Sequence, residues 1–166
     1  MDDPDDDDMV ALAALARRQW ADFVAVGPTR AGLIAYHTRT KFLILAHSED
    51  HYRRLGRLPA AMGTSPLPTI VAKYGQLLGQ ALDRRPTRGS HINTLQHLAG
   101  MCRKELAVDA RAGLTRTIDA YRAGTTSLSR ARAELRRCAR SIGKDYVLAQ
   151  TYLRPPDTAA VCRPDE

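Results

Sequence analysis

Apolar residues recur every three or four positions through most of this chain, and this spacing restricts its fold more than any other feature. Over residues 10–24 the positions at this spacing are Leu12, Leu15, Ala16, Trp20 and Phe23. Gly27 and Pro28 then interrupt the pattern, as expected at the end of a helix. No stretch combines period-two alternation with β-branched residues. The sequence therefore predicts an all-α fold.

The same spacing divides the rest of the chain into further helices, seven to eight in all. The later ones are expected at about 29–46, 49–58, 69–82, 88–106, 109–124, 128–142 and 145–153. A loop is expected at 63–68, where two prolines and a glycine cannot continue a helix. Ser48, Thr69 and Asp109 are predicted N-caps, and Gly124 is the predicted residue just past a helix end.

Length and composition favour one domain. The chain has 166 residues, of which 44% are hydrophobic, enough for one core of moderate size. We expect an acidic disordered tail at 1–8, a compact helical bundle at 9–156 and a loose tail at 157–166. The acidic start does not resemble a secretory signal, and no apolar run is long enough for a membrane span. The expected location is the cytoplasm, without a membrane partner.

The three cysteines, Cys102, Cys138 and Cys162, form no CxxC pair. An odd, scattered set is a poor framework for disulfides, zinc or an iron–sulfur cluster, so neither a metal nor another cofactor is predicted. Cys102 and Cys138 fall on apolar helix faces, which indicates core positions.

The charge is distributed unevenly. The formal net charge is +7, yet residues 9–154 contain 24 basic and 9 acidic residues, which is +15 for the body. A basic surface attracts phosphate backbones, and a mobile acidic tail could compete with nucleic acid for it. The alternative is that the basic surface reflects genome composition and not a partner. Arginine outnumbers lysine by 21 to 4, and a GC-rich genome encodes arginine freely.

Polar residues gather in short segments, and all five histidines lie in three of them. An arginine stripe at positions 132, 136 and 140 is expected to face outwards. The predicted nucleic-acid-binding residues are His37, Lys41, His47, Ser48, Tyr52, Arg57, Arg88, Asn93, Gln96, His97, Lys104, Arg132, Arg136 and Arg140. Aromatic residues make up only 5% of the chain, so shape-and-phosphate recognition of a folded RNA fits better than stacking of single strands.

The histidines leave other interpretations open. His47 and His51, four positions apart, could bind zinc or form a hydrogen-bonded structural pair. His97 could act as a general base, but the sequence places no nucleophile near it. An enzyme acting on nucleotides would require His37, His47 and His97 to converge on one pocket. No catalytic residue is assigned from the sequence.

Several strings of this chain resemble one bacterial family. HTRTKFLILAHSEDHYRRLGRL, RGSHINTLQHLAG, IDAYRAG and LAQTYLRP are similar to the YbgA-type domain of unknown function, over about residues 20–156. The segment 128–141 departs from the family pattern, because it is rich in arginine.

The resemblance implies a role beside an enzyme. In many proteins this domain is fused to a TudS-type desulfidase, which removes sulfur from thiouracil with an iron–sulfur cluster. By that resemblance, the chain would present RNA, tRNA with 4-thiouridine above all, while a TudS-type partner performs the chemistry of tRNA demodification. A second alternative is an adaptor that docks such a desulfidase or a DNA-repair enzyme.

Overall fold

Helices account for the regular structure of the chain. The computed structural model describes residues 4–155, with side chains from Asp7 onwards, and this part contains no strand. Its α-helices are α1 (Pro4–Ala25), α2 (Arg30–His47), α3 (Glu49–Ala60), α4 (Leu67–Leu82), α5 (Arg88–Cys102), α6 (Val108–Arg122), α7 (Leu128–Ser141) and α8 (Asp145–Leu148). Two short 3-10 helices are η1 (Ala61–Gly63) and η2 (Thr151–Leu153). The prediction of a compact all-α fold is confirmed.

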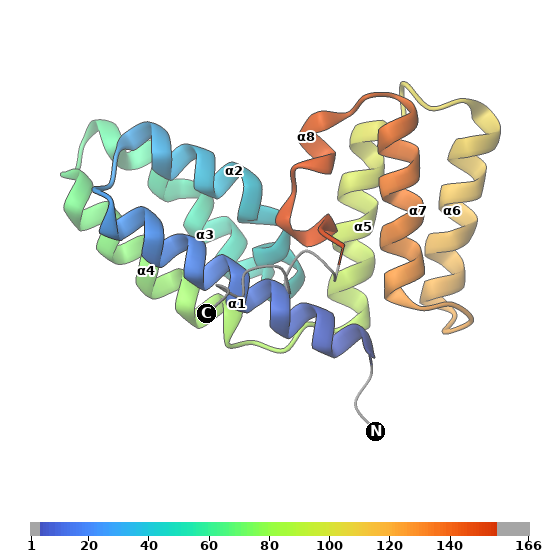
Figure 1. Ribbon diagram of the computed structural model, residues 1–166, viewed down its shortest axis with the longest axis horizontal. Helices are drawn as coiled ribbons and strands as arrows, with labels where there is room; N and C mark the ends of the chain where they lie inside the picture. Colours follow the sequence, from blue (N-terminus) through green and yellow to red (C-terminus); the bar gives the residue numbers. More distant parts are fainter. Residues whose placement is uncertain (1–3, 156–166) are drawn as a thin grey trace, which may run out of the picture.

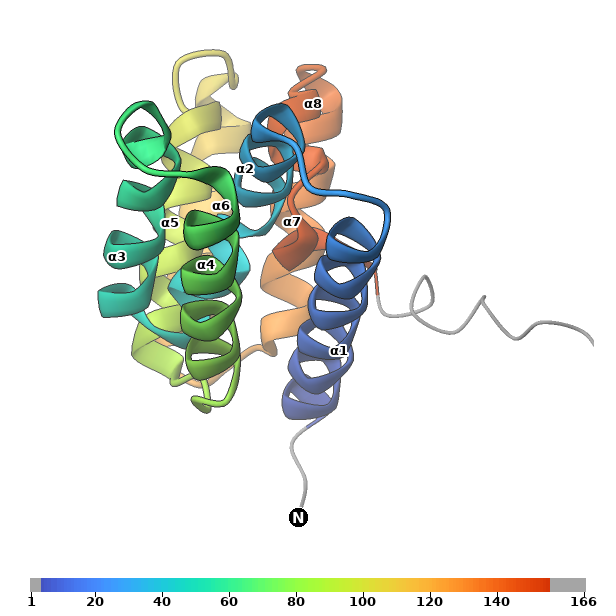
Figure 2. The ribbon, with the colours of Figure 1, turned by 90° about the vertical axis from the view of Figure 1, so that its left-hand side faces the viewer.

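The helices form two groups that share α2. Helices α1 to α4 lie side by side, and α5, α6 and α7 form the second group (Figure 1). Within the first group α2 lies between α1 and α3 (Figure 2), and it also packs against α5. His37 contacts Tyr74, and His47 contacts Arg84 just past the end of α4; both pairs are 37 residues apart. Because this separation is the same at both ends of the contact, α2 and α4 run parallel.

An aromatic cluster fixes α1 against α2 and α4. The rings of Trp20 and Tyr74 stack with centroids 4.9 Å apart, and Tyr36 meets Trp20 edge-on at 5.1 Å. A Cβ on Gly75 would lie 2.8 Å from the indole nitrogen of Trp20, closer than real contacts permit. Glycine at this position therefore allows α1 to approach α4 closely enough for the rings to stack.

The acidic segment 1–8, expected to be a disordered tail, is helical from Pro4 onwards, where α1 begins. Proline suits the first turn of a helix, and the positive end of the helix dipole favours acidic residues close to a helix N-terminus. Asp8 also accepts a hydrogen bond from Arg132 on α7 at 3.0 Å. Residues 1–3 and the predicted loose tail at 157–166 lie outside the described residues.

Two predicted termini are confirmed by their geometry. The Ser48 hydroxyl accepts a hydrogen bond from the backbone N–H of His51, so Ser48 is the N-cap of α3. Gly124 follows the C-cap of α6 with φ +76°, the left-handed conformation that glycine adopts without strain. Serine before the first turn and glycine after the last turn are both strong local signals for a helix terminus.

Other termini differ from the predicted ones. Pro66 rather than Thr69 is the N-cap of α4, because Pro68 fits inside the first turn. Asp109 lies in the first turn of α6 instead of capping it. The helix expected at 145–153 is divided into α8 and η2. None of the described helices is both long and apolar enough to span a bilayer.

The two cysteines in the described chain are core residues, as predicted. Cys102 and Cys138 are completely buried, and burial raises the pKa of both thiols above the ordinary value. Both therefore stay protonated and unreactive at neutral pH. Cys162 lies outside the described residues.

Candidate nucleic-acid interface

Arg132 does not face outwards, and its predicted role in nucleic-acid binding is wrong. Only 1% of its surface is exposed. Its Nε donates to the carbonyl of Tyr152 at 2.9 Å, Nη2 donates to the carbonyl of Arg154 at 2.6 Å, and Nη1 pairs with Asp8. The segment after α8 returns along α7 and supplies these carbonyl acceptors. Arg132 therefore joins three segments of the fold and cannot reach a phosphate.

The rest of the arginine stripe is only partly available. Arg136 is half-buried, and its Nη1 donates to the carbonyl of Leu153 at 3.0 Å. Arg140 is the member of the stripe that lies exposed on the described surface. With one of its three members exposed, the stripe is a weak basis for a phosphate-binding surface.

His37 is a neutral, half-buried side chain on α2. Its Nδ1 lies 2.9 Å from the Tyr74 hydroxyl, and its Nε2 faces Gly56 of α3. Burial, with a smaller contribution from the positive charge of Lys41, lowers the pKa of His37 from 6.5 to about 4. The histidine is therefore uncharged at neutral pH and serves as a hydrogen-bonding link between α2 and α4.

Lys41 and Tyr52 both lie beside the ring of Phe42 on α2. The Lys41 ammonium is 5.2 Å from the centre of the Phe42 ring and 5.5 Å from that of Tyr146. Tyr52 packs on Phe42 with centroids 6.5 Å apart. Both predicted residues are half-buried, whereas Arg57 is exposed on α3.

His47, Ser48 and His51 are buried at the corner between α2 and α3. The Nδ1 of His47 lies 2.6 Å from the carbonyl oxygen of Arg84, which can only accept, so Nδ1 carries the proton. Burial lowers the pKa of His47, which leaves its Nε2 as an unprotonated acceptor without a partner among the described residues. His51 bonds instead to Ser48, with Nδ1 2.9 Å from the hydroxyl.

The histidines do not converge on one pocket. His37 and His47 are ten positions apart on α2, a separation of roughly 15 Å along a helix. His97 lies on the exposed surface of α5. The described residues also contain no group of three histidine, cysteine, aspartate or glutamate side chains placed to hold a metal ion. His37, His47 and His97 are therefore not brought together in one pocket, as the enzyme that the sequence left open would require.

One face of α5 gathers polar and basic residues, and we call it the α5 polar face. Its members are Asn93, Gln96, His97, Gly100, Arg103 and Lys104. At about 100° per residue the first five fall within about 120° of the helix circumference, and Lys104 follows in the next turn. Asn93 is half-buried and the others are exposed. Neither Arg103 nor Lys104 pairs with a carboxylate in the described part of the chain.

A pocket of about 380 Å³ opens beside this face, between α5 and α6. Leu106, Leu114 and Ile118 give it an apolar floor. Gln96 and Arg103 line it from the α5 side, and Arg111 lines it from α6. The pocket thus combines an apolar floor with two guanidinium groups and an amide.

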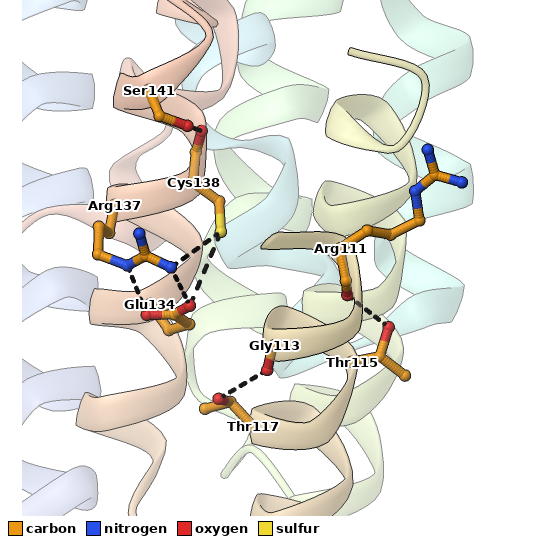
Figure 3. A network of polar contacts seen from close by, with 8 residues as sticks. All are labelled: Arg111, Gly113, Thr115, Thr117, Glu134, Arg137, Cys138 and Ser141. Carbon is orange, nitrogen blue, oxygen red and sulfur yellow. Dashed lines mark hydrogen bonds and ion pairs between the residues drawn. The ribbon is translucent and has the colours of Figure 1, made fainter. Parts of the chain in front are cut away.

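Arg111 directs its charge away from the neighbouring helix. Figure 3 shows its side chain pointing away from α7, where Glu134 accepts two hydrogen bonds from Arg137. The Nη2 of Arg111 donates to the carbonyl of Leu106 at 3.2 Å, and its Nε is buried with no acceptor in the described structure. Asp119, the carboxylate that lines the pocket, pairs with Arg122 at 2.6 Å.

Several other exposed arginines are occupied within the fold. Arg88 donates from Nη1 to the carbonyl of Tyr121 at 2.6 Å and lies over the ring of the same residue. On α3, Arg53 pairs with Glu49 at 2.6 Å and Arg54 with Asp50 at 3.3 Å. Among the predicted binding residues, Gln96, His97 and Lys104 are thus brought together, while Arg88 lies at the other end of α5.

Sequence reasoning missed Arg103 and Arg111. Arg103 had a usable signal, because it precedes the predicted Lys104 and lies seven positions after Gln96, on the same face of the helix. Arg111 had none, since only the antiparallel packing of α6 on α5 brings it to the pocket.

Comparison with known proteins gives two matches. Residues 41–156 match the family described as "Protein of unknown function (DUF1722)". The chain is also similar to a curated relative, the "Uncharacterized protein YbgA" of Escherichia coli (strain K12), with 31% identity over 123 residues, which are 74% of this chain and 73% of the relative. No solved structure matches the chain.

Proposed function

This chain belongs to the DUF1722 family, to which YbgA-type domains correspond, and from that premise we propose that it binds folded RNA through the α5 polar face. The single observation that carries the proposal is the juxtaposition of Arg103 and Lys104 with the α5–α6 pocket and its second guanidinium, Arg111. Two unpaired cations beside a pocket of this kind can hold phosphates while polar side chains meet bases or 2′-hydroxyls.

The charge of the whole body supports the same proposal. Residues 9–154 carry a formal +15, and several acidic residues of the body already pair with other arginines. The α5 polar face contains no carboxylate, and the nearby Asp119 and Glu105 pair with Arg122 and Lys144. Such a surface draws polyanions by releasing the counterions that surround them.

The positions of the aromatic residues favour folded RNA over an extended single strand. Trp20, Tyr36 and Tyr74 are joined in the cluster between α1, α2 and α4, and Tyr152 is buried. Tyr146 is 38% exposed and already lies beside Lys41. The described surface therefore offers no row of aromatic rings on which successive bases could stack.

Our finer proposal is that the RNA is tRNA, with 4-thiouridine as the modification of interest, and that the chain acts as an accessory module for tRNA demodification. The support is the resemblance to domains fused to TudS-type desulfidases. An accessory role also fits a fold whose histidines serve as separate hydrogen-bonding links rather than as one pocket.

A second candidate function is docking of a protein partner, such as a TudS-type desulfidase. A pocket of about 460 Å³ between α1 and α4 is lined by Trp20, Val24, Leu67 and Val71. Near it, the apolar side chain of Val26 is 83% exposed, and a contiguous apolar surface of this kind can mark a site for a protein partner. Val26→Asp should then abolish co-purification with the desulfidase and leave tRNA affinity unchanged. Equal recovery of the complex with the variant would remove this function.

The test of RNA binding is a fluorescence-anisotropy titration of tRNA, with and without 4-thiouridine, against duplex DNA of equal length. Arg103→Ala/Lys104→Ala should weaken tRNA binding by roughly tenfold for each lost phosphate contact at about 0.1 M salt. Arg53→Ala/Arg54→Ala is the matched control, because it removes the same charge from arginines that are already paired. Equal losses of affinity in both variants would mean that binding depends on the net charge of the protein and not on this face. No loss of affinity in either variant would reject the proposal.

A further inference from the structure

We infer that the α5–α6 pocket holds one unpaired nucleobase of the bound RNA, and that residue 100 is glycine so that this base can approach the backbone of α5. The inference rests on the proposed function, because it names the part of the RNA that the same face would take. It is carried by three features of the described residues: Gly100, the floor of the pocket and the donors at its edge.

Gly100 has no structural reason to be glycine. Glycine destabilises a helix relative to alanine, and Gly100 lies within the last turn of α5. A Cβ at this position would meet no atom within 4 Å, whereas a Cβ on Gly32 would lie 2.7 Å from the ring of Phe23. The φ angle of Gly100 is not positive either, unlike those of the glycines in the turns. Neither packing nor backbone conformation therefore requires the missing side chain.

The space that Gly100 leaves open is the pocket itself. Gly100 lines it together with Gln96 of α5 and with Arg103, the residue that follows the last one of this helix. A side chain here would extend into the volume of about 380 Å³ that a ligand would occupy. Glycine at a ligand site commonly permits close approach of the ligand to the backbone, and this function would account for the loss of helix stability.

The floor and size of the pocket suit a flat heterocycle. Leu106, Leu114 and Ile118 provide an apolar surface for the face of a ring. The volume lies at the lower end of the range for small-molecule pockets, about 300–1,000 Å³. An unstacked base from a loop is the part of a folded RNA that can enter such a space, because paired bases are held in the helix.

The donors at the edge select the kind of base. Guanidinium groups donate hydrogen bonds and cannot accept them, and those of Arg103 and Arg111 line the pocket. Uracil and guanine carry a keto oxygen, O4 or O6, that can accept from Arg103 and Arg111. Cytosine and adenine carry an amino group at that position, from which guanidinium groups cannot accept. The Asp119 carboxylate, which also lines the pocket, is paired with Arg122.

The test uses variants of the full chain that fill the pocket without changing charge. Gly100→Leu places a side chain in the pocket, and Gly89→Leu places the same side chain on the first turn of α5, where the Cβ meets only Thr87 at 3.8 Å. Circular dichroism establishes that both variants keep the helical fold. We expect Gly100→Leu to weaken tRNA binding at least tenfold, while Gly89→Leu binds like the wild type.

Failure of the inference and failure of RNA binding give different results. If Arg103→Ala/Lys104→Ala weakens tRNA binding and Gly100→Leu does not, the pocket is empty in the complex and the inference is overturned, while RNA binding stands. If neither change affects affinity, both proposals fail. Base preference is read from amide chemical shifts with uridine or cytidine monophosphate, where larger shifts near Gly100 with uridine are expected. Equal shifts would overturn the selection of keto bases.

Discussion

Replacing Asp8 with asparagine should destabilise the protein strongly, although the residue lies in a segment that looks like a disordered tail in the sequence. Its carboxylate is the partner of Arg132, whose side chain is 1% exposed, and only 16% of the Asp8 side chain is exposed. The pair joins α1 to α7 across 124 residues of sequence. Asparagine keeps the size of the side chain but removes its charge, so Arg132 stays buried without a counterion.

The size of the effect follows from what Arg132 retains. Removing one partner of a buried pair typically costs about 3–5 kcal/mol. The carbonyls of Tyr152 and Arg154 still accept from Arg132 in the variant, so we expect about 2–3 kcal/mol. For a chain of this length each kcal/mol lowers Tm by about 2–4 °C, which gives a decrease of roughly 4–12 °C.

Thermal unfolding followed by circular dichroism measures this decrease. Asp7→Asn is the matched control, because it makes the same change one residue earlier on an exposed side chain. A Tm of Asp8→Asn equal to that of Asp7→Asn would refute the reasoning that Arg132 depends on this carboxylate. A truncation that tests the acidic segment as a competitor of nucleic acid should therefore stop before Asp8, so that loss of stability is not mistaken for altered binding.

Three further predictions concern stability and reactivity. Because the pKa of His37 is about 4 in the folded chain and 6.5 ordinarily, the unfolded chain binds the proton more readily, so stability is lost as the pH falls from 6.5 towards 4. The loss should reach about 2.5 kcal/mol at pH 4.5. Urea unfolding at pH 7 and 4.5 should show a smaller loss in His37→Gln, and an unchanged loss would contradict this. Arg88→Ala should lower stability by about 1 kcal/mol, because the hydrogen bond to the end of α6 and the contact with a ring disappear; an unchanged Tm would argue against it. In a Cys162→Ser background, Cys102 and Cys138 should react with a thiol reagent only after urea unfolds the protein, since both are buried with a raised pKa; rapid labelling of the folded protein would show otherwise.

The helices could be predicted from the sequence because their signals are local. Apolar spacing within each helix identifies it, and residues such as Gly27 and Gly124, both with positive φ, end it. Ser48 is recognisable as an N-cap for the same reason. A signal contained within a few residues needs no knowledge of the tertiary structure.

The position of Arg132 could not be predicted, because its partners come from distant segments. On α7 alone it shares an apparent outer stripe with Arg136 and Arg140. The segment around Tyr152 then covers it and supplies backbone carbonyls, which leave no trace in the sequence pattern. Helical periodicity identifies the buried face of an isolated helix, but not which polar residues a returning chain segment will cover.

The candidate site was predicted in part. Gln96, His97 and Lys104 share one face of a helix, so their proximity follows from helical geometry. Arg111 joins them only because α6 packs antiparallel to α5, which local spacing cannot indicate. The proposed role of Gly100 could not be predicted either, because it depends on the tertiary structure leaving the space beside this residue open.

The most direct test of RNA binding through the α5 polar face is the salt dependence of tRNA affinity for the wild type and Arg103→Ala/Lys104→Ala. Each phosphate contact contributes about 0.7–0.9 to the slope of log affinity against log salt. The variant should therefore show a slope smaller in magnitude by about 1.4–1.8, with Arg53→Ala/Arg54→Ala close to the wild type. Parallel lines for all three proteins would contradict the assignment of the interface to this face.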